Sequence, residues 1–426
     1  MKAKSPLEIY KLLPKTNCMK CGTTCMGFAT NLIQRKQKLD ECPYLDEKAR
    51  KKIAELIEPN IKEIEFDGLV VGGEEVLFRH ELTFFNKPPF LIKANEQNYE
   101  EVVKEVKSYK KIYIGKELKL DGILLEFKGD KDKFLRALKE IDLSLAIVAP
   151  PNVLKSALEV RRTAIGYATV ENYEDFLEVA KAYEVPVMIK SNDLRELKFL
   201  AEKFRGEGVK YVINPVLDRI SSCYDRVIKI RVNGIKGDRD FAYPIMVEID
   251  FDDVFYSAMA SMTFVCRYAD LMVFREVNPL VLMPSIVLRE NIYTDPRIPV
   301  AVESGLYKIG NPNGNAPVFV TTNFMLTYYT VKTDLESAGI DCYLLVIDTG
   351  GICVGASVAS GRFNANAVKE ALDKFKVEEK VKHRKLIIPG LASRLKGAIE
   401  DATGWEVLVG PVDSSAIKDW LEKVWS

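Results

Sequence analysis

Short apolar runs alternate with amphipathic stretches from about residue 62 to about residue 310, and this repetition constrains the fold more than any other feature of the chain. The runs hold five to seven residues without strict polar alternation, which is typical of strands buried on both faces. Repeated strand and helix predict a parallel sheet of the α/β class, and about eight such units close a (β/α)8 TIM barrel. Residues 220–310 are irregular, and not every strand can be paired with its helix. The eight runs are FLIKA (90–94), KIYIG (111–115), GILLEFK (122–128), SLAIVAP (144–150), AIGYAT (164–169), VPVMIKS (185–191), KYVINPV (210–216) and PIMVEID (244–250).

A second α/β pattern begins near residue 312. The stretch NPNGNAP is rich in Asn, Gly and Pro, which is typical of a linker. Four strand–helix units follow it and predict a doubly wound α/β domain. The strands are predicted over 318–323, 343–349, 385–390 and 405–411, and the helices over roughly 324–338, 364–377, 391–403 and 414–425.

Four of the eight cysteines fall within 25 residues near the N-terminus, with the spacing C-x2-C-x3-C-x16-C. In a long chain without a secretory signal, clustered cysteines indicate metal binding rather than disulfides. Cys18, Cys21 and Cys25 form one tight loop, and Cys42 is followed by Pro43. This layout is closer to iron–sulfur ligation than to the paired C-x2-C knuckles of many zinc sites. We expect a 4Fe-4S cluster, with structural zinc or reduced structural thiols as the alternatives. The helical pattern in MGFATNLIQRKQKLDE would return Cys42 to the loop.

The predicted C-terminal strands all end in small or hydroxyl-bearing residues. Ligands of open α/β sheets bind beyond the carboxyl ends of the strands, so four such ends on one edge favour a large polar ligand approached by backbone groups. The alternative is a set of ordinary tight turns. Neither G-x-G-x-x-G nor a Walker phosphate loop is present, and His383 precedes its strand, away from these ends. The strand ends are Thr321-Thr322-Asn323, Asp348-Thr349-Gly350-Gly351, Pro389-Gly390 and Gly410-Pro411.

Composition excludes several classes of function. Acidic and basic residues balance at 61 each, so no overall field draws the chain to nucleic acid or to an anionic membrane. No apolar run approaches the ~18–20 residues that span a bilayer. The N-terminus, MKAKSPLEIYKLLPK, lacks the apolar stretch of a secretory signal. We therefore expect a cytoplasmic protein that binds neither nucleic acid nor membrane.

Several segments together resemble the large (gamma) subunit of the corrinoid iron–sulfur protein in the acetyl-CoA decarbonylase/synthase (CO dehydrogenase/acetyl-CoA synthase) complex. They are SPLEIYKLLPKTNCMKCGTTCMGFA and ECPYL at the start, VGGEEVLFRHELTFFNKPP before the barrel, and VTTNFMLTYY, HRKLIIPG and GWEVLVGP near the end. The resemblance implies a 4Fe-4S module over 1–60, a TIM barrel over 61–311 and a Rossmann-like corrinoid-binding domain over 312–426.

The resemblance also implies a function as a methyl-group carrier, a methyltransferase component. The cobalt of a base-off corrinoid would accept a methyl group from a methylated tetrahydropterin, through a methyltransferase activity, and pass it to acetyl-CoA synthase. The cluster would reduce cobalt that has drifted to cob(II). The small (delta) subunit, also a barrel, would be the partner. An iron–sulfur electron-transfer protein without corrinoid is the alternative function, and a zinc-stabilised scaffold is a third.

Site residues follow from the same resemblance. The cluster ligands map to Cys18, Cys21, Cys25 and Cys42, and the corrinoid contacts map to Thr321, Thr327, Gly351, Ile352, Cys353, Val354 and Ser414. Two departures from the family pattern stand out. The family usually has four residues between its second and third cysteines, where this chain has GTT, and an acidic residue is commoner at the position of Gly350.

The barrel shows no convincing catalytic set. Arg79-His80-Glu81, and acidic residues at strand ends such as Glu248 and Asp250, are interpreted as structural. We expect this barrel mainly to dock the partner and to position the other domains.

Overall fold

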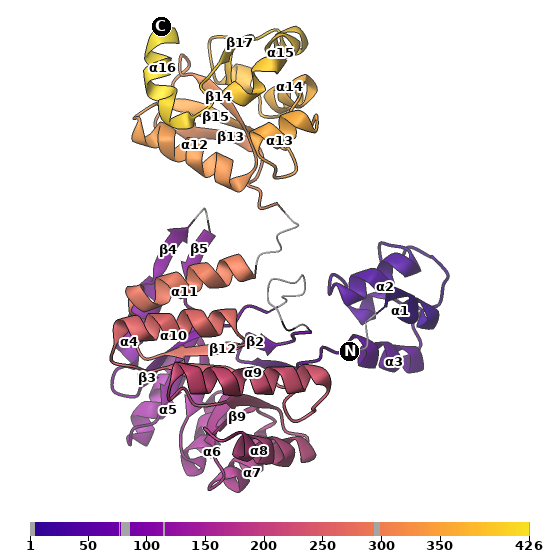
Figure 1. Cartoon of the computed structure of the whole chain (residues 1–426), viewed down its shortest axis with the longest axis vertical. Helices are drawn as coiled ribbons and strands as arrows, with labels where there is room; N and C mark the ends of the chain where they lie inside the picture. Colours follow the sequence, from indigo (N-terminus) through magenta and orange to yellow (C-terminus); the bar gives the residue numbers. More distant parts are fainter. Residues whose placement is uncertain (1–4, 76, 78–85, 114–115, 294–298, 426) are drawn as a thin grey trace. The chain divides into compact units, whose positions relative to one another are not determined.

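The computed structural model describes residues 5–75, 77, 86–113, 116–293 and 299–425 (Figure 1). The chain divides into two compact units. One holds residues 1–111 and 118–295, and the other holds residues 112–117 and 296–426. None of the helices within the described ranges has the length and apolar composition needed to cross a bilayer.

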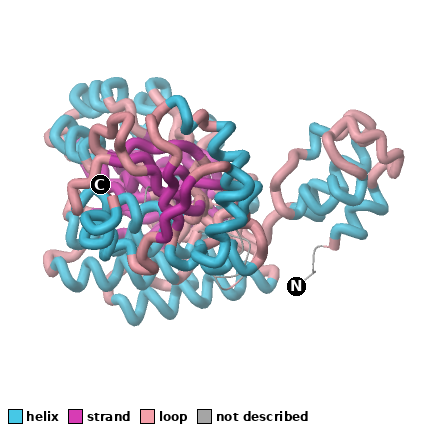
Figure 2. Tube along the Cα trace, turned by 90° about the horizontal axis from the view of Figure 1, so that it is seen from above, coloured by secondary structure: helices cyan, strands magenta, loops and turns pink. Residues whose placement is uncertain are grey.

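The N-terminal part of the first unit is a small helical module built from α1 (Pro6–Leu12), α2 (Cys25–Ile33) and α3 (Glu47–Ile57). Residues 5–62 are described in full and contain helices and loops but no strand (Figure 2). The side chains of Ile9, Phe28 and Ile53 bring the three helices together in one hydrophobic core. The helix predicted to begin near Met26 ends at Ile33, and loop and 3-10 turns lead on to Cys42.

The rest of the first unit is an eight-stranded parallel barrel, preceded by a pair of strands, β1 (Glu63–Phe66) and β2 (Leu69–Gly72). The strand order is β10-β9-β8-β7-β6-β3-β12-β11, and a parallel bridge between Ile213 and Ile245 joins its two ends. The predicted TIM barrel is confirmed. Its strands are β3 (Phe90–Asn95), β6 (Gly122–Glu126), β7 (Ser144–Val148), β8 (Ala164–Ala168), β9 (Val187–Lys190), β10 (Tyr211–Asn214), β11 (Met246–Ile249) and β12 (Leu271–Phe274).

Eight helices follow these strands along the chain. They are α4 (Tyr99–Ser108), α5 (Lys131–Glu140), α6 (Pro151–Val160), α7 (Tyr173–Tyr183), α8 (Leu194–Gly206), α9 (Ile220–Lys236), α10 (Val254–Cys266) and α11 (Pro279–Ile292). Each of α4, α5, α7 and α8 has a buried apolar stripe and a charged opposite side, the pattern of helices that cover a barrel.

One predicted barrel strand is placed elsewhere. The run KIYIG contributes to β4 (Lys110–Tyr113), which pairs with β5 (Lys116–Lys119) in a separate two-stranded sheet. Ile112 is 80% exposed there, so the run does not have the burial of a barrel strand. The strand that completes the barrel is β12, in the stretch that looked irregular from sequence.

The second unit is a five-stranded sheet of order β13-β15-β14-β16-β17. The last four strands in this order are parallel, as predicted, and β13 (Gly305–Ile309) is antiparallel at the edge. Residues 311–317, predicted as a linker, connect β13 to β14 within the sheet. The other elements are β14 (Val318–Thr322), α12 (Met325–Ser337), β15 (Cys342–Ile347), α13 (Val354–Ala359), α14 (Ala365–Lys374), β16 (Lys385–Ile388), α15 (Lys396–Thr403), β17 (Glu406–Val409) and α16 (Ile417–Val424).

Candidate functional site

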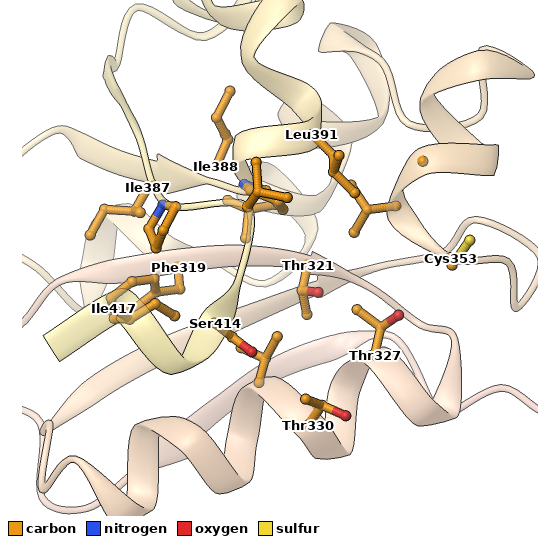
Figure 3. A pocket seen from close by; sticks show the side chains of 18 of the residues that line it. Phe319, Thr321, Thr327, Thr330, Cys353, Ile387, Ile388, Leu391, Ser414 and Ile417 are labelled. Carbon is orange, nitrogen blue, oxygen red and sulfur yellow. The ribbon is translucent and has the colours of Figure 1, made fainter. Parts of the chain in front are cut away.

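A cavity of about 410 Å3 lies in the second unit, at the carboxyl ends of its parallel strands (Figure 3). β14 and β16 are neighbours in the sheet although β15 lies between them in the chain, so the strand order reverses here. Such a reversal leaves a crevice where ligands of open α/β proteins bind. The lining includes Phe319 of β14 and Ile387 of β16, one on each side of the switch.

Five of the seven predicted corrinoid contacts line this cavity. They are Thr321 at the end of β14, Thr327 on α12, Cys353 and Val354 at the start of α13, and Ser414 after β17. The structure therefore brings together residues that lie up to 93 positions apart in the chain, counted from Thr321 to Ser414.

The other two predicted contacts, Gly351 and Ile352, are not among the lining residues. The Gly351 N–H donates to the side-chain oxygen Oδ1 of Asn323 at 2.9 Å, and the carbonyl of Ile352 accepts from the Thr349 hydroxyl at 3.0 Å. Gly351 has a φ of +73°, a conformation that disfavours a side chain. These two residues shape the loop behind the cavity wall.

Asn323 fastens this loop to the end of β14. Its Oδ1 also accepts the backbone N–H and the hydroxyl of Thr349, at 3.0 and 3.1 Å. Its amide nitrogen donates to Asp348 at 3.0 Å. Because Asn323 is only 5% exposed, these bonds are shielded from water, and they hold the β15–α13 loop in one conformation.

The hydroxyl groups at the cavity differ in their freedom to bind a ligand. Ser414 donates to the Asp334 carboxylate. The Thr321 side-chain oxygen is buried and has no hydrogen-bond partner among the described residues. A buried hydroxyl without a partner is costly, and here it lines a cavity, so it is positioned to hydrogen-bond a bound molecule.

Apolar residues form much of the remaining wall, and sequence reasoning missed them. Leu326, Leu391 and Val412 line the cavity and are 52, 51 and 71% exposed. Leu391 directly follows Pro389-Gly390, and Val412 directly follows Gly410-Pro411. Turn residues are usually polar. A large apolar side chain directly after a strand-end turn was therefore the sequence signal that could have indicated an apolar cavity wall.

These residues fit a corrinoid. Small residues at the strand ends let a large ring approach the backbone, and the apolar wall suits its hydrocarbon parts. A cavity of about 410 Å3 would hold part of such a molecule. His383 lies before β16 and not in the cavity lining: its Nε2 is 3.0 Å from the Ala316 carbonyl, and its ring packs edge-on against Trp425. His80 lies outside the described residues.

The cysteine loop has an unusual backbone. Four of the eight residues from 15 to 22 have a left-handed conformation: Lys15, Asn17, Met19 and Gly22, with φ of 59°, 46°, 59° and 81°. Backbone of this kind can turn successive N–H groups toward an anion, as in many iron–sulfur sites. The Cys25 N–H donates to Asn17 Oδ1 at 3.0 Å, which ties the loop to the start of α2.

The four cysteines share this region without converging on one point. Cys25 and Cys42 are buried in the module's core and Cys21 packs against it, whereas Cys18 is exposed. A hydrogen bond from the backbone of Lys20 lowers the pKa of the Cys18 thiol. Among the described residues, no three His, Cys, Asp or Glu side chains are gathered as in a metal site. The ligand set thus stays a prediction.

Comparisons with known proteins identify the family. The family model of the CO dehydrogenase/acetyl-CoA synthase delta subunit matches residues 65–421. A model described as "Putative Fe-S cluster" matches residues 13–44. The acetyl-CoA decarbonylase/synthase complex subunit gamma of Archaeoglobus fulgidus is 44% identical, over 100% of this chain and 99% of its own length. The gamma 2 subunit of Methanosarcina thermophila is 41% identical, over 100% and 99%.

The chain belongs to the family of acetyl-CoA decarbonylase/synthase gamma subunits. The resemblance inferred from sequence is confirmed, and the match over residues 13–44 spans all four clustered cysteines and supports an iron–sulfur cofactor. Among solved structures, dihydropteroate synthase from Thermus thermophilus aligns with 51% of this chain and 98% of its own. The TM-score is 0.37 at 14% identity, a likeness too weak to say anything about function.

The barrel of this gamma-subunit chain carries an ionic network around the buried Glu248, at the carboxyl ends of its strands. Glu248 of β11 contacts Lys93 of β3 and Lys190 of β9, each at 2.9 Å. Burial opposes ionisation of Glu248, but the two ammonium groups outweigh it and lower the pKa of the carboxyl to about 2. Asp250 pairs with Lys93 at 2.7 Å. Both acidic residues are thus salt-bridged, consistent with a structural role, whereas Arg79-His80-Glu81 lies outside the described residues.

Proposed function

We propose that the chain is the methyl-group carrier of the acetyl-CoA decarbonylase/synthase complex. A corrinoid would occupy the C-terminal cavity, and a 4Fe-4S cluster would be held by Cys18, Cys21, Cys25 and Cys42. When bound, the corrinoid supplies a cobalt centre that takes a methyl group from a methylated tetrahydropterin and yields it to acetyl-CoA synthase, while the cluster supplies the reactivating electron. The observation that carries the proposal is the cavity at the strand-order switch, which is lined by Thr321, a residue whose buried hydroxyl has no hydrogen-bond partner among the described residues.

Different residues of the cavity would bind different parts of the ligand. Thr321 and Thr327 offer hydroxyl groups to the polar edge of the ring. The hydrogen bonds of Asn323 hold the loop before α13 in place, so this loop would lose little conformational entropy when a ligand binds. Leu391 and Val412 would cover apolar parts of the ligand and exclude water.

The proposal also names partners. The delta subunit would form the heterodimer, a methyltransferase or the methylated pterin would deliver the methyl group, and acetyl-CoA synthase would receive it. The support is the family membership together with two separate candidate sites, a cysteine loop on one unit and a cavity on the other.

Anaerobic metal analysis with an absorption spectrum tests the function. The chain would be purified alone and with its delta subunit, and reconstituted with iron, sulfide and a corrinoid. We expect about four irons per chain and about one cobalt with corrinoid absorption bands. Iron without cobalt after reconstitution would instead identify an electron-transfer protein, and zinc alone would identify a structural site.

A further inference from the structure

A second cavity, of about 370 Å3, lies at the carboxyl ends of the barrel strands. We call it the barrel-mouth cavity. All of its lining residues belong to the first unit, whereas the cavity proposed for the corrinoid belongs to the second. Enzymes with a (β/α)8 barrel bind their ligands at this end of the fold, and the proposed function uses no residue there. The polar side chains of the wall are Lys93, Asn95, Asn98, Glu126, Asp250 and Arg275.

The two asparagines of the wall have their amide nitrogens available. Asn98 Oδ1 accepts the backbone N–H of Asn95 at 2.8 Å, and Asn95 Oδ1 accepts the backbone N–H of Gln97 at 2.8 Å. Each side-chain oxygen is therefore occupied, and no described residue accepts from either amide nitrogen. Because an amide nitrogen carries two N–H donors, both residues can donate to a molecule in the cavity.

Lys93 adds a charged donor in a fixed position. Its ammonium contacts Glu248 at 2.9 Å and Asp250 at 2.7 Å, and the side chain is 17% exposed. Burial opposes the charge, but the two carboxylates outweigh it and raise the pKa of Lys93 to about 12. An ammonium has three N–H donors, so two contacts leave one for a ligand.

A buried carboxylate fastens the loops beside the cavity. Glu96 is 2% exposed and accepts the backbone N–H of Lys128 at 2.9 and 3.0 Å and that of Asp130 at 3.1 Å. These bonds join the loop after β3, which carries Asn98, to the loop after β6. A site that is fixed in this way loses little conformational entropy when a ligand binds.

The charges of the wall balance, but its carboxylates are already paired. Lys93 and Arg275 are positive, and Glu126 and Asp250 are negative. Asp250 contacts Lys93 at 2.7 Å and Arg275 at 3.8 Å, and Glu126 contacts Lys128 at 2.8 Å. The wall therefore offers more donors than acceptors. A ligand with one negative charge suits it best, because the two carboxylates repel a doubly charged anion twice as strongly.

We propose that the barrel-mouth cavity binds a small carboxylic acid as its anion. The carboxylate accepts from the amide groups of Asn95 and Asn98 and from the remaining N–H of Lys93. Hydrogen bonds to a charged acceptor are roughly twice as strong as those between neutral groups. Arg275 is half exposed at the same cavity and attracts the anion from solution. The inference is independent of the proposed function, because the corrinoid and cluster sites contain none of these residues.

Saturation-transfer NMR titration of the full chain with acetate and with butyrate, at constant ionic strength, tests the proposal. We expect both acids to bind saturably. Asn95→Asp keeps the oxygen that accepts from Gln97 and replaces the amide donor by a second carboxylate oxygen, so it should weaken binding by roughly 10-fold or more. Arg275→Gln should weaken it by a smaller factor.

The matched control is Asn313→Asp in the second unit. Asn313 Oδ1 accepts the backbone N–H of Asn315 at 2.8 Å, the same local hydrogen bond as at Asn95, and the change in charge is identical. This variant should bind both acids as the unchanged chain does. Thermal unfolding checks that every variant is folded.

Several outcomes would overturn the proposal. They are no saturable binding of either acid, equal affinity in Asn95→Asp and Asn313→Asp, and tighter binding of inorganic phosphate than of both acids. Cobalt uptake from a corrinoid, measured on the same variants, reports separately on the carrier function. Asn95→Asp should take up cobalt as the unchanged chain does, and loss of both ligands in this variant would show that the substitution does not act at the barrel mouth.

Discussion

At the scale of single residues, two neighbouring threonines at the end of β14 offer a matched pair. The Thr321 and Thr322 hydroxyls are both buried without a hydrogen-bond partner among the described residues, but only Thr321 lines the cavity. Replacing either by Val removes the unsatisfied hydroxyl at nearly constant volume. We therefore expect both variants to gain up to about 1 kcal/mol in free energy of unfolding.

Only Thr321→Val should also weaken corrinoid binding, by roughly 10-fold for one lost hydrogen bond. Denaturant unfolding without ligand and absorbance titration with a corrinoid measure the two effects. Equal affinity in both variants would mean that Thr321 does not contact the ligand.

Arg231 carries a fully buried charge in the barrel. Its side chain is 0% exposed and pairs with Glu74 and Asp270, which are themselves buried. Arg231→Met removes the positive charge that pairs with two buried carboxylates, so we expect a loss of about 3–5 kcal/mol in free energy of unfolding. The control is Arg195→Met, whose side chain is 91% exposed in its pair with Asp193 and should change stability by less than about 1 kcal/mol. Similar losses of unfolding free energy for Arg231→Met and Arg195→Met, measured by urea unfolding, would contradict this account of Arg231.

At the scale of elements, Glu248 joins strands from opposite sides of the barrel. Lys93 lies on β3 and Lys190 on β9, four steps apart in the closed strand order, and Asn214 of β10 donates to the same carboxylate at 2.6 Å. The lowered pKa of Glu248, about 2 against an ordinary 4.5, means that the ionised form stabilises the fold by about 3 kcal/mol.

The pH dependence of this contribution has a definite sign. Because the pKa is depressed in the folded protein, the stabilisation is complete above pH 4.5 and is lost as pH falls toward 2. We expect the difference in free energy of unfolding between the unchanged chain and Glu248→Gln to be about 3 kcal/mol at pH 7 and to shrink steadily below pH 4.5. A difference independent of pH would show that the loss is steric and not ionic.

The sequence predicts the elements whose ends are marked by a change of period or composition, and it misses those without such a change. Buried runs such as those of β14 and β15, bounded by helices with charged sides, are recognisable because period and composition change together. β12 follows α10, whose residues include no charged one, so the amphipathic period that marks the other helices is missing before this strand. β13 is the edge strand GLYKI, only partly buried, and the Asn- and Pro-rich stretch after it looks like a linker.

The candidate site shows the same division. Thr321 could be found because strand ends of a parallel sheet share one edge, whereas Cys353 and Ser414 were mapped from the family resemblance. The apolar wall could not be found from polar strand ends alone. Nor could the partner of Ser414, since Asp334 comes from the far end of α12 and meets it only through tertiary packing.

At the scale of the whole molecule, the two candidate cofactor sites lie on units with separate cores. The second unit encloses its own hydrophobic clusters, which include Trp405, Phe363 and Leu335, and the cysteine module has another around Phe28. A unit with its own core is expected to fold alone. A carrier that serves several partners needs such independence, because its cofactor must be presented to each of them.

Expression of residues 296–426 as a separate chain tests this organisation. We expect a folded fragment that binds a corrinoid within about tenfold of the full chain's affinity, takes up no iron, and loses affinity on Thr321→Val. The complementary fragment, residues 1–295, should take up iron and no corrinoid. Absorbance titration and iron analysis of the two fragments measure this. If the folded fragment 296–426 binds a corrinoid only when the fragment 1–295 is present, the cavity is only part of the site. Iron uptake that needs both fragments would place a cluster ligand outside the cysteine loop.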